Sequence, residues 1–373
     1  MQRQGPLAGI HVLDLTRLYP GAYATLLLAD LGADVVKVED RERGDYLREI
    51  DGGGQFEALN RGKRSLSIDL KSLHGPALLQ RLCAAADVLV EGFRPGVLGK
   101  LGCGPRALVE KNPRLVVCSL TGYGQDGPWA ARAGHDIGYV ALAGVLARNG
   151  LGEVPVLPGV QIADFAGGSL QAVIGILAAL YERERTGRGR TLDISMCEGA
   201  MQFLIPHSGS LAAGQPPQAR GDDVLSGSRP CYRVYACSDG SAVALGALEP
   251  KFWSAFCAAV GKPDWESRGF DSSLAPEVDA LFRSASRDEW VSRLQPADCC
   301  LEPVLEPNEL RGHPQHRARG AFLPDGTLRS QPALSTPAGS RAPKLGEHSV
   351  EVLREHGLSQ EEIEGLRVAR AIA

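Results

Sequence analysis

The sequence predicts an α/β protein with two parts, a large domain built on a Rossmann-like parallel sheet and a small α+β domain. Two observations support this prediction. Over the first 130 residues, short runs rich in β-branched residues alternate with helical runs, which is the pattern of a parallel sheet with crossover helices. From about residue 225 this alternation is replaced by a hairpin pattern and short helical runs.

The elements of the first part follow from periodicity and from terminal residues. Helical period and length predict helices over 21–33 and 75–86. A longer helix is predicted over 164–186, with Asp164 at the N-cap and Gly187 just past the C-terminus. The five predicted strands cover 10–15, 34–39, 65–70, 87–92 and 114–120.

The second part begins with a hairpin over 231–248, in which Asp239 and Gly240 form the turn. Helical runs follow at 250–261 and 286–295, a Pro-, Gly- and Arg-rich connection at 306–346, and two short helices within 349–371. We therefore expect a large domain over 1–224, a small domain over 225–305, and a linker with a C-terminal segment over 306–373 that returns to the large domain.

Composition narrows the class of protein. A length of 373 residues favours two domains, and a net charge of −4 argues against a nucleic-acid or anionic-membrane partner. No apolar stretch is expected to reach transmembrane length, and neither a signal peptide nor a peroxisomal address is expected at the ends. Nine scattered cysteines without a C-x-x-C pair indicate reduced thiols and a cytoplasmic protein.

Three motifs are expected to be structural. Gly122, Gly124 and Gly127 match the dinucleotide fingerprint, but Pro128 and polar residues follow where that fingerprint needs a helix. An H-x-x-H pair at 313 and 316 lies in the connection without a third ligand nearby, so no metal site is predicted. Cys197 and Ser195 are expected to be a buried thiol and an ordinary hydroxyl.

Basic residues at predicted strand ends form the first candidate site. Arg61, Lys63 and Arg64 follow one another closely, and Arg94 stands just past another strand. Composition alone favours a solvated turn for the cluster. Its position favours phosphate binding instead, because open α/β sheets bind ligands at such edges.

Four residues are candidates for acid–base chemistry. His135 lies between glycines ahead of an apolar segment, and Asp136 is best explained as the N-cap of that segment, because neighbouring side chains diverge and form a poor hydrogen-bonded pair. Asp164 opens the long helix, where it is either an N-cap or a functional carboxylate beside N–H groups that could bind an oxyanion. Glu249 follows a strand of the small domain.

Together these segments resemble the α-methylacyl-CoA racemases, a group within the family III CoA-transferase superfamily. The resemblance lies in 134–139, 163–190 and 243–253, and it extends in order over nearly the whole chain. It implies two interlocked protomers, with each active site between the large domain of one protomer and the small domain of the other. The implied substrate is an acyl-CoA, and no cofactor is implied beyond the coenzyme A that the substrate carries.

The resemblance also implies roles for individual residues. His135 and Asp164 correspond to two catalytic bases on opposite faces of the α-carbon, and Glu249 to a carboxylate beside the histidine. Two bases suit this chemistry, since inversion removes a proton on one face and returns one on the other. The implied lining of the coenzyme A and thioester pockets comprises Arg17, Arg41, Ser67, Ile68, Asp69, Leu70, Gly134, Asp136, Ile137, Gly138 and Tyr139.

The sequence departs from these relatives at several positions. Gly138 stands where racemases usually carry Asn, and Asp40 stands where they carry an Arg that contacts coenzyme A phosphates, a role that Arg41 or Arg43 could take. Ser226 and Arg229 replace an aspartate and an alanine. Because Arg binds carboxylates through two hydrogen bonds, Arg229 is predicted to favour an acyl group with a carboxylate or other polar substituent.

Two other functions fit the same residues. In a transferase that moves coenzyme A between carboxylic acids, Asp164 would be the nucleophile and would form an anhydride. His135 argues against this activity, because the transferases of the family usually lack that histidine. A non-enzymatic coenzyme A-binding protein would leave His135, Asp164 and Glu249 without a function.

Overall fold

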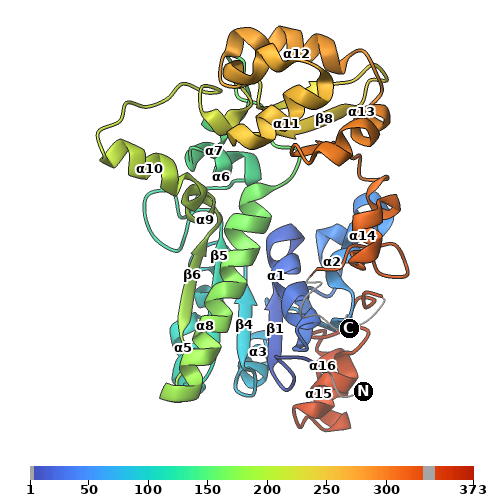
Figure 1. The fold of residues 1–373 in the computed structure, drawn as a ribbon. Helices are drawn as coiled ribbons and strands as arrows, with labels where there is room; N and C mark the ends of the chain where they lie inside the picture. Colours follow the sequence, from blue (N-terminus) through green and yellow to red (C-terminus); the bar gives the residue numbers. More distant parts are fainter. Residues whose placement is uncertain (1–3, 331–340) are drawn as a thin grey trace. The chain divides into compact units, whose positions relative to one another are not determined.

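The computed structural model describes residues 4–330 and 341–373 (Figure 1). The chain forms two compact units. The first holds the residues up to Ala143, then Gly159–Phe203 and the residues from Gln315 onward, and the second holds Gly144–Pro158 and Leu204–Pro314. The predicted domain ranges, 1–224, 225–305 and 306–373, remain a prediction. The two units are defined by the contacts between residues.

The first unit is built on a six-stranded parallel sheet with the order β3-β2-β1-β4-β5-β6. All five predicted strands are present, and β6 is an additional edge strand in which exposed and less exposed residues alternate. The strand order reverses between β1 and β4, so the loops after these two strands diverge at their carboxyl ends. The strands are β1 (His11–Leu15), β2 (Asp34–Glu39), β3 (Arg64–Ser67), β4 (Val88–Glu91), β5 (Val116–Thr121) and β6 (Thr191–Ser195).

Apolar residues of the strands and helices form the core of this unit. Leu66, Leu89 and Val117 of the sheet belong to one buried cluster with Leu79 of α3 and Ile363 of α16, so the C-terminal helices complete the core. The helices are α1 (Leu18–Asp30), α2 (Gly54–Asn60), α3 (Gly75–Cys83), α4 (Val97–Lys100), α5 (Pro105–Lys111), α6 (Asp136–Leu142), α8 (Gln171–Thr186), α9 (Met196–Met201), α15 (Ser349–Glu355) and α16 (Gln360–Val368).

The long predicted helix is present but begins differently. A π-helical segment, η3 (Ala163–Leu170), leads directly into α8, and Gly187 ends the helix in the left-handed conformation with a φ of 69°. Asp164 is therefore not the N-cap residue: Ile162 holds that position, and Asp164 is the second residue of the helical segment. Single π turns are frequent at functional sites.

The same helix contradicts the expectation that no apolar stretch reaches transmembrane length. Ala163–Thr186 spans 24 residues with a mean hydropathy of 1.5 over its most apolar window, which is long and apolar enough to cross a membrane by length and composition. Half of that window is buried inside the described structure, as in the core helix of many soluble proteins. The expected absence of a membrane partner stays a prediction.

The second unit contains the predicted hairpin, in which β7 pairs antiparallel with β8 and Gly240 turns with a φ of 81°. A short third strand, β9, extends the sheet to the order β7-β8-β9. Phe256, Phe282 and Trp290 pack beneath it in an aromatic core. The elements are α7 (Val145–Arg148), α10 (Ile205–Ala212), β7 (Tyr232–Ala236), β8 (Ala242–Gly246), α11 (Pro250–Val260), α12 (Ala275–Phe282), α13 (Arg287–Leu294) and β9 (Leu301–Pro303).

The predicted connection over 306–346 is only partly described, because 331–340 lies outside the described residues. It includes the short helix α14 (Pro314–Ala318).

Candidate active site

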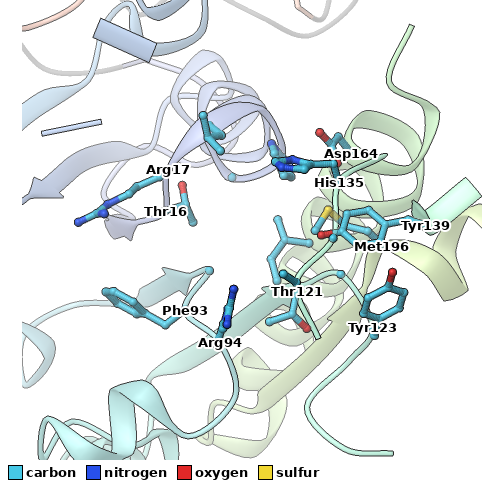
Figure 2. A pocket seen from close by; sticks show the side chains of 18 of the residues that line it. Thr16, Arg17, Phe93, Arg94, Thr121, Tyr123, His135, Tyr139, Asp164 and Met196 are labelled. Atoms are coloured by element: carbon cyan, nitrogen blue, oxygen red, sulfur yellow. The ribbon is translucent and has the colours of Figure 1, made fainter. Parts of the chain in front are cut away.

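A cavity of about 320 Å³ opens in the first unit, where the strand order reverses. Segments that follow β1, β4 and β5 meet there with the beginnings of α6 and η3 (Figure 2). This is the edge of an open α/β sheet at which ligands are expected to bind. The residues of its lining used below are Thr16, Arg17, Phe93, Arg94, Thr121, Gly122, Tyr123, Gly134, His135, Tyr139, Asp164 and Met196.

His135 and Asp164 line the same cavity although 28 residues separate them in the chain. His135 is exposed and holds the N-cap position of α6 in an extended conformation, with a φ of −134°. Its main-chain carbonyl accepts hydrogen bonds from the N–H groups of Gly138 and Tyr139, so the ring is carried by the first turn of the helix. The imidazole is thereby presented to the cavity by a fixed main chain.

Asp136 has a different role from the N-cap that its sequence position predicted. It is the first residue of α6, and its Oδ1 accepts the main-chain N–H of Asp164 at 2.9 Å. The cavity lining includes the preceding residue, His135, but not Asp136 itself. The expectation that this side chain binds substrate is therefore not supported.

The carboxyl group of Asp164 is partly buried and has an altered acidity. Burial, and after it the negative charge of Asp136, raise the pKa of Asp164 from 3.8 to about 7. A carboxylate in such surroundings is a stronger base than one in water, because its charged form is poorly solvated. The main-chain N–H groups of Asp164 and Phe165 already have acceptors in Asp136 and Gln161, so they are not the expected oxyanion donors.

Close backbone packing places the segment that carries Asp164. A methyl group on Gly199 of α9 would lie 1.9 Å from the carbonyl oxygen of Gly167 in η3, and one on Gly167 would lie 2.5 Å from the carbonyl oxygen of Met196. Only glycine allows this approach at both positions. The two glycines therefore set the distance between η3 and α9 beside the cavity.

Tyr139 is buried at the wall of the cavity, with 7% of its surface exposed. Its ring packs so closely against Gly122 and Gly134 that a methyl group on these glycines would lie 2.3 Å and 2.6 Å from it. Burial, with the charge of Asp164 next, raises the pKa of Tyr139 to about 12. The hydroxyl therefore keeps its proton near neutrality and can donate it in a hydrogen bond.

The predicted residues Arg17 and Arg94 line this cavity, and Arg17 also lines a second cavity. Arg17 and Phe93 are shared with a neighbouring space of about 530 Å³, whose lining includes the predicted residues Arg41, Ile68, Asp69 and Leu70. Arg17 donates hydrogen bonds to the Tyr46 hydroxyl at 3.0 Å and to Asp40 at 3.2 Å. Arg43 and Lys71 also line the second space, and Lys71 is a residue that the sequence reasoning missed although it adjoins the predicted segment.

The cluster at 61–64 does not reach either cavity, which corrects its assignment as a phosphate site. Arg61 is buried and pairs with Asp30 through both of its terminal nitrogens. Lys63 is buried against Asp14, and Arg64 pairs with Asp34 and with two glutamates of α15. These three side chains form ion pairs within the protein, so they stabilise the fold.

Other predicted lining residues also lie elsewhere. Ser67 is fully buried, and its hydroxyl accepts the main-chain N–H of Ala373 at 2.9 Å. Ile137 is 53% exposed, and neither it nor Gly138 belongs to the lining of either cavity. A methyl group on Gly138 would lie 3.3 Å from the Tyr123 hydroxyl, so a larger residue there would press on a cavity residue.

The remaining candidates belong to the second unit. Glu249 is exposed at the N-cap of α11 and makes no side-chain capping bond. Arg229 lies with its guanidinium nitrogens 3.5 Å from the main-chain carbonyls of Phe270 and Asp222. The pairing of Glu249 with His135 and the preference given by Arg229 stay predictions.

The glycine pattern and the residues Ser195 and Cys197 have the following surroundings. After the glycine pattern at 122–127 no helix begins until Asp136, and Gln125 instead donates its main-chain N–H to Asp193. Ser195 is the N-cap of α9, and burial raises the pKa of the Cys197 thiol. Within the described ranges no group of three or more metal-ligating side chains occurs, and all nine cysteines are free.

Comparisons with known proteins agree on one family. The model of CoA-transferase family III matches residues 7–349. The chain is 41% identical to an alpha-methylacyl-CoA racemase of Mus musculus, over 98% of this chain and 97% of the relative, and 39% identical to that of Homo sapiens, over 96% and 95%. A CAIB/BAIF family protein from Brucella suis has a similar structure, with a TM-score of 0.83, 30% identity, and coverage of 95% of this chain and 100% of that protein.

Proposed function

Because the chain belongs to CoA-transferase family III, we propose that it is an α-methylacyl-CoA racemase, an isomerase of lipid metabolism that inverts the α-carbon of 2-methyl-branched acyl-CoA thioesters. One observation carries the proposal: a histidine and a carboxylate of raised pKa line one cavity at the ligand-binding edge of the sheet. Imidazole and carboxyl groups are side chains that accept and return protons in general acid–base catalysis, which is what inversion next to a thioester requires.

In the proposed reaction two bases act from opposite sides. In one direction the Asp164 carboxylate removes the α-proton, the electrons of the broken C–H bond form the enolate, and protonated His135 returns a proton to the other face. In the reverse direction neutral His135 removes the proton and protonated Asp164 returns one. No cofactor is needed for these steps, and coenzyme A enters as part of the substrate.

The enolate oxygen requires a donor, and the hydroxyl of Tyr139, which lines the cavity together with His135 and Asp164, is our candidate. We assign it this role in place of the helix opening at Asp164, whose N–H groups are engaged. Glu249 is proposed to orient His135 and to balance its charge.

The phosphates and adenosine of coenzyme A are proposed to occupy the second cavity and its junction with the first. Arg17 lines both spaces, Arg94 lines the first, and Arg41 lines the second. The Nε atom of Arg41 is buried without a hydrogen-bond partner, which favours an anionic ligand on this guanidinium over a purely structural role. Arg41 is therefore our candidate for the cation that Asp40 replaces in this sequence.

A homodimer in the cytoplasm is also proposed, with no membrane or nucleic-acid partner. In the second unit the loop before Gly159 exposes Leu151, Val154, Val156 and Leu157, whose exposed fractions are 53%, 75%, 56% and 52%. A run of exposed apolar side chains of this size favours a protein interface. Light scattering after gel filtration would give twice the monomer mass if the proposal holds, and the monomer mass would contradict it.

The experiment that tests the activity uses one epimer of a 2-methylacyl-CoA in D₂O. We expect α-deuterium uptake by mass spectrometry together with loss of configuration by chiral analysis, and both should disappear in His135→Ala and Asp164→Asn. The alternative, transfer of coenzyme A between carboxylic acids, breaks no α-C–H bond, so it would give no α-deuterium uptake even with an acceptor acid. It would instead form an Asp164 anhydride that hydroxylamine traps.

A further inference from the structure

Asp136 links the two proposed catalytic residues through a single hydrogen bond. It follows His135 directly in α6, and its Oδ1 accepts the N–H of Asp164 in η3 at 2.9 Å. An N-cap residue bonds an N–H of its own helix, whereas this carboxylate reaches a residue 28 positions later. The bond therefore joins the turn that carries the histidine to the segment that carries the carboxylate.

The main chain of Asp164 is held by side chains on both sides. While Asp136 accepts its N–H, the Ser169 hydroxyl lies 3.0 Å from its carbonyl oxygen and 2.6 Å from the carbonyl oxygen of Pro20. Ser169 is fully buried, so this contact is shielded from water. The first N–H groups of a helical segment lack partners within the helix, and Asp136 supplies an acceptor for the N–H of Asp164.

The charges around Asp164 can be named element by element. From α6 and its N-cap come His135, Asp136 and Tyr139, and the cavity that Asp164 lines is also lined by Arg17 and Arg94. From α1 come Tyr19 and Tyr23, whose rings pack on that of Phe165. Of these groups, Asp136 is the one whose charge, second to burial, raises the pKa of Asp164.

We propose that Asp136 is a positioning residue for Asp164, holding its main chain and placing a second negative charge beside the carboxyl group that exchanges protons. The proposal rests on the racemase function proposed above. Its consequence is that one side chain sets both the place of Asp164 relative to His135 and the pH range in which Asp164 can act as a base.

Three variants separate position from charge. Asp136→Asn keeps an oxygen acceptor for the Asp164 N–H and removes the charge, whereas Asp136→Ala removes both. Ser169→Ala is the matched control, because it releases the other side of the same main chain without changing any charge. The first measurement is the titration of the Asp164 carboxyl group by ¹³C NMR, assigned by the loss of its signal in Asp164→Asn.

We expect the titration midpoint of Asp164 to fall by roughly one pH unit in Asp136→Asn and to stay in place in Ser169→Ala, because removing a nearby like charge favours the ionised form. In the exchange assay, Asp136→Asn should keep its maximal rate within a few fold, while its pH profile shifts to lower pH in both directions. Asp136→Ala should lose on the order of tenfold to a hundredfold in rate, since the carboxylate is then misplaced.

An unchanged midpoint in Asp136→Asn would overturn the proposal, and so would an Asp136→Ala variant with the wild-type rate. The titration does not depend on activity. If the wild-type protein catalysed no exchange while the midpoint still moved as expected, the proposed function would fail and the effect of Asp136 on Asp164 would stand. If Asp136→Ala does not fold, the titration midpoints of Asp164 in Asp136→Asn and in Ser169→Ala still test the proposal.

Discussion

Asp14 and Asp164 are two carboxylic acids withdrawn from water in the same unit, and their surroundings drive their acidities apart. Burial alone would raise the pKa of Asp14, but Lys37 and Lys63 beside it, and hydrogen bonds from two threonines, lower it to about 2. At Asp164 no such cation opposes burial, and the neighbouring charge is that of Asp136, so its pKa rises to about 7. Burial is common to both sites, and the charged neighbours decide the outcome.

The difference separates a structural site from a functional one. Lys37 donates to the carbonyl of Thr16 at 3.0 Å, and Asp14 accepts the N–H and the hydroxyl of the same threonine at 2.9 Å and 2.5 Å. The network therefore holds the loop from which Thr16 and Arg17 line the cavity. The Asp14 carboxylate has two lysines beside it, whereas the carboxyl group of Asp164 has the like charge of Asp136 beside it.

The largest expected effect comes from breaking the network around Asp14. Asp14→Asn leaves Lys37 and Lys63 buried without their shared carboxylate, so the free energy of unfolding should fall by roughly 3–5 kcal/mol. Urea denaturation followed by circular dichroism measures this loss. A variant as stable as the wild type would show that the network does not support the fold.

Substitution of Asp164 should instead reduce activity without reducing stability. In Asp164→Asn we expect α-deuterium exchange to fall by about 10²–10³-fold, because a proton-transfer group is lost. The free energy of unfolding should stay equal or increase, since a poorly solvated carboxyl group has been removed. A large loss of stability together with retained exchange would reverse the comparison.

Arg94 and Arg61 allow the same comparison between a residue that lines the cavity and a residue that stabilises the fold. Arg94→Gln should raise the KM for acyl-CoA roughly tenfold through loss of a charge-assisted contact, and it should change the free energy of unfolding by less than about 0.5 kcal/mol. Arg61→Gln is the matched control, because it removes the buried ion pair between Arg61 and Asp30. That variant should lose stability while the KM of the folded protein stays unchanged, and the opposite pattern would return the phosphate site to Arg61.

The smallest expected effect is a difference in the pH dependence of stability. The folded-state pKa of Asp14 is depressed, so its contribution is present above about pH 4 and is lost as the pH falls toward 2. The folded-state pKa of Asp164 is raised, so its contribution is present below about pH 4 and is lost as the pH rises through 7. Between about pH 4 and 7, the Tm of the wild type should therefore decrease relative to that of Asp164→Asn, and parallel curves would contradict the raised pKa.

The sequence by itself determined the parallel sheet, the hairpin and the end of the long helix at Gly187, because these depend on local period and on local backbone preferences. It also singled out His135 and Asp164 through resemblance. The edge strand β6 was missed because a short, half-exposed run has no distinctive apolar pattern.

Only the tertiary structure decided which charges have partners. Arg61 precedes β3 and Arg94 follows β4 of the same sheet, but Asp30, which pairs with Arg61, is 31 residues away in the chain. The bond from Asp164 to Asp136 likewise spans 28 residues. Electrostatic surroundings depend on distances in space that local sequence does not encode, so the reactive carboxylate and the structural one were told apart only by their neighbours in the fold.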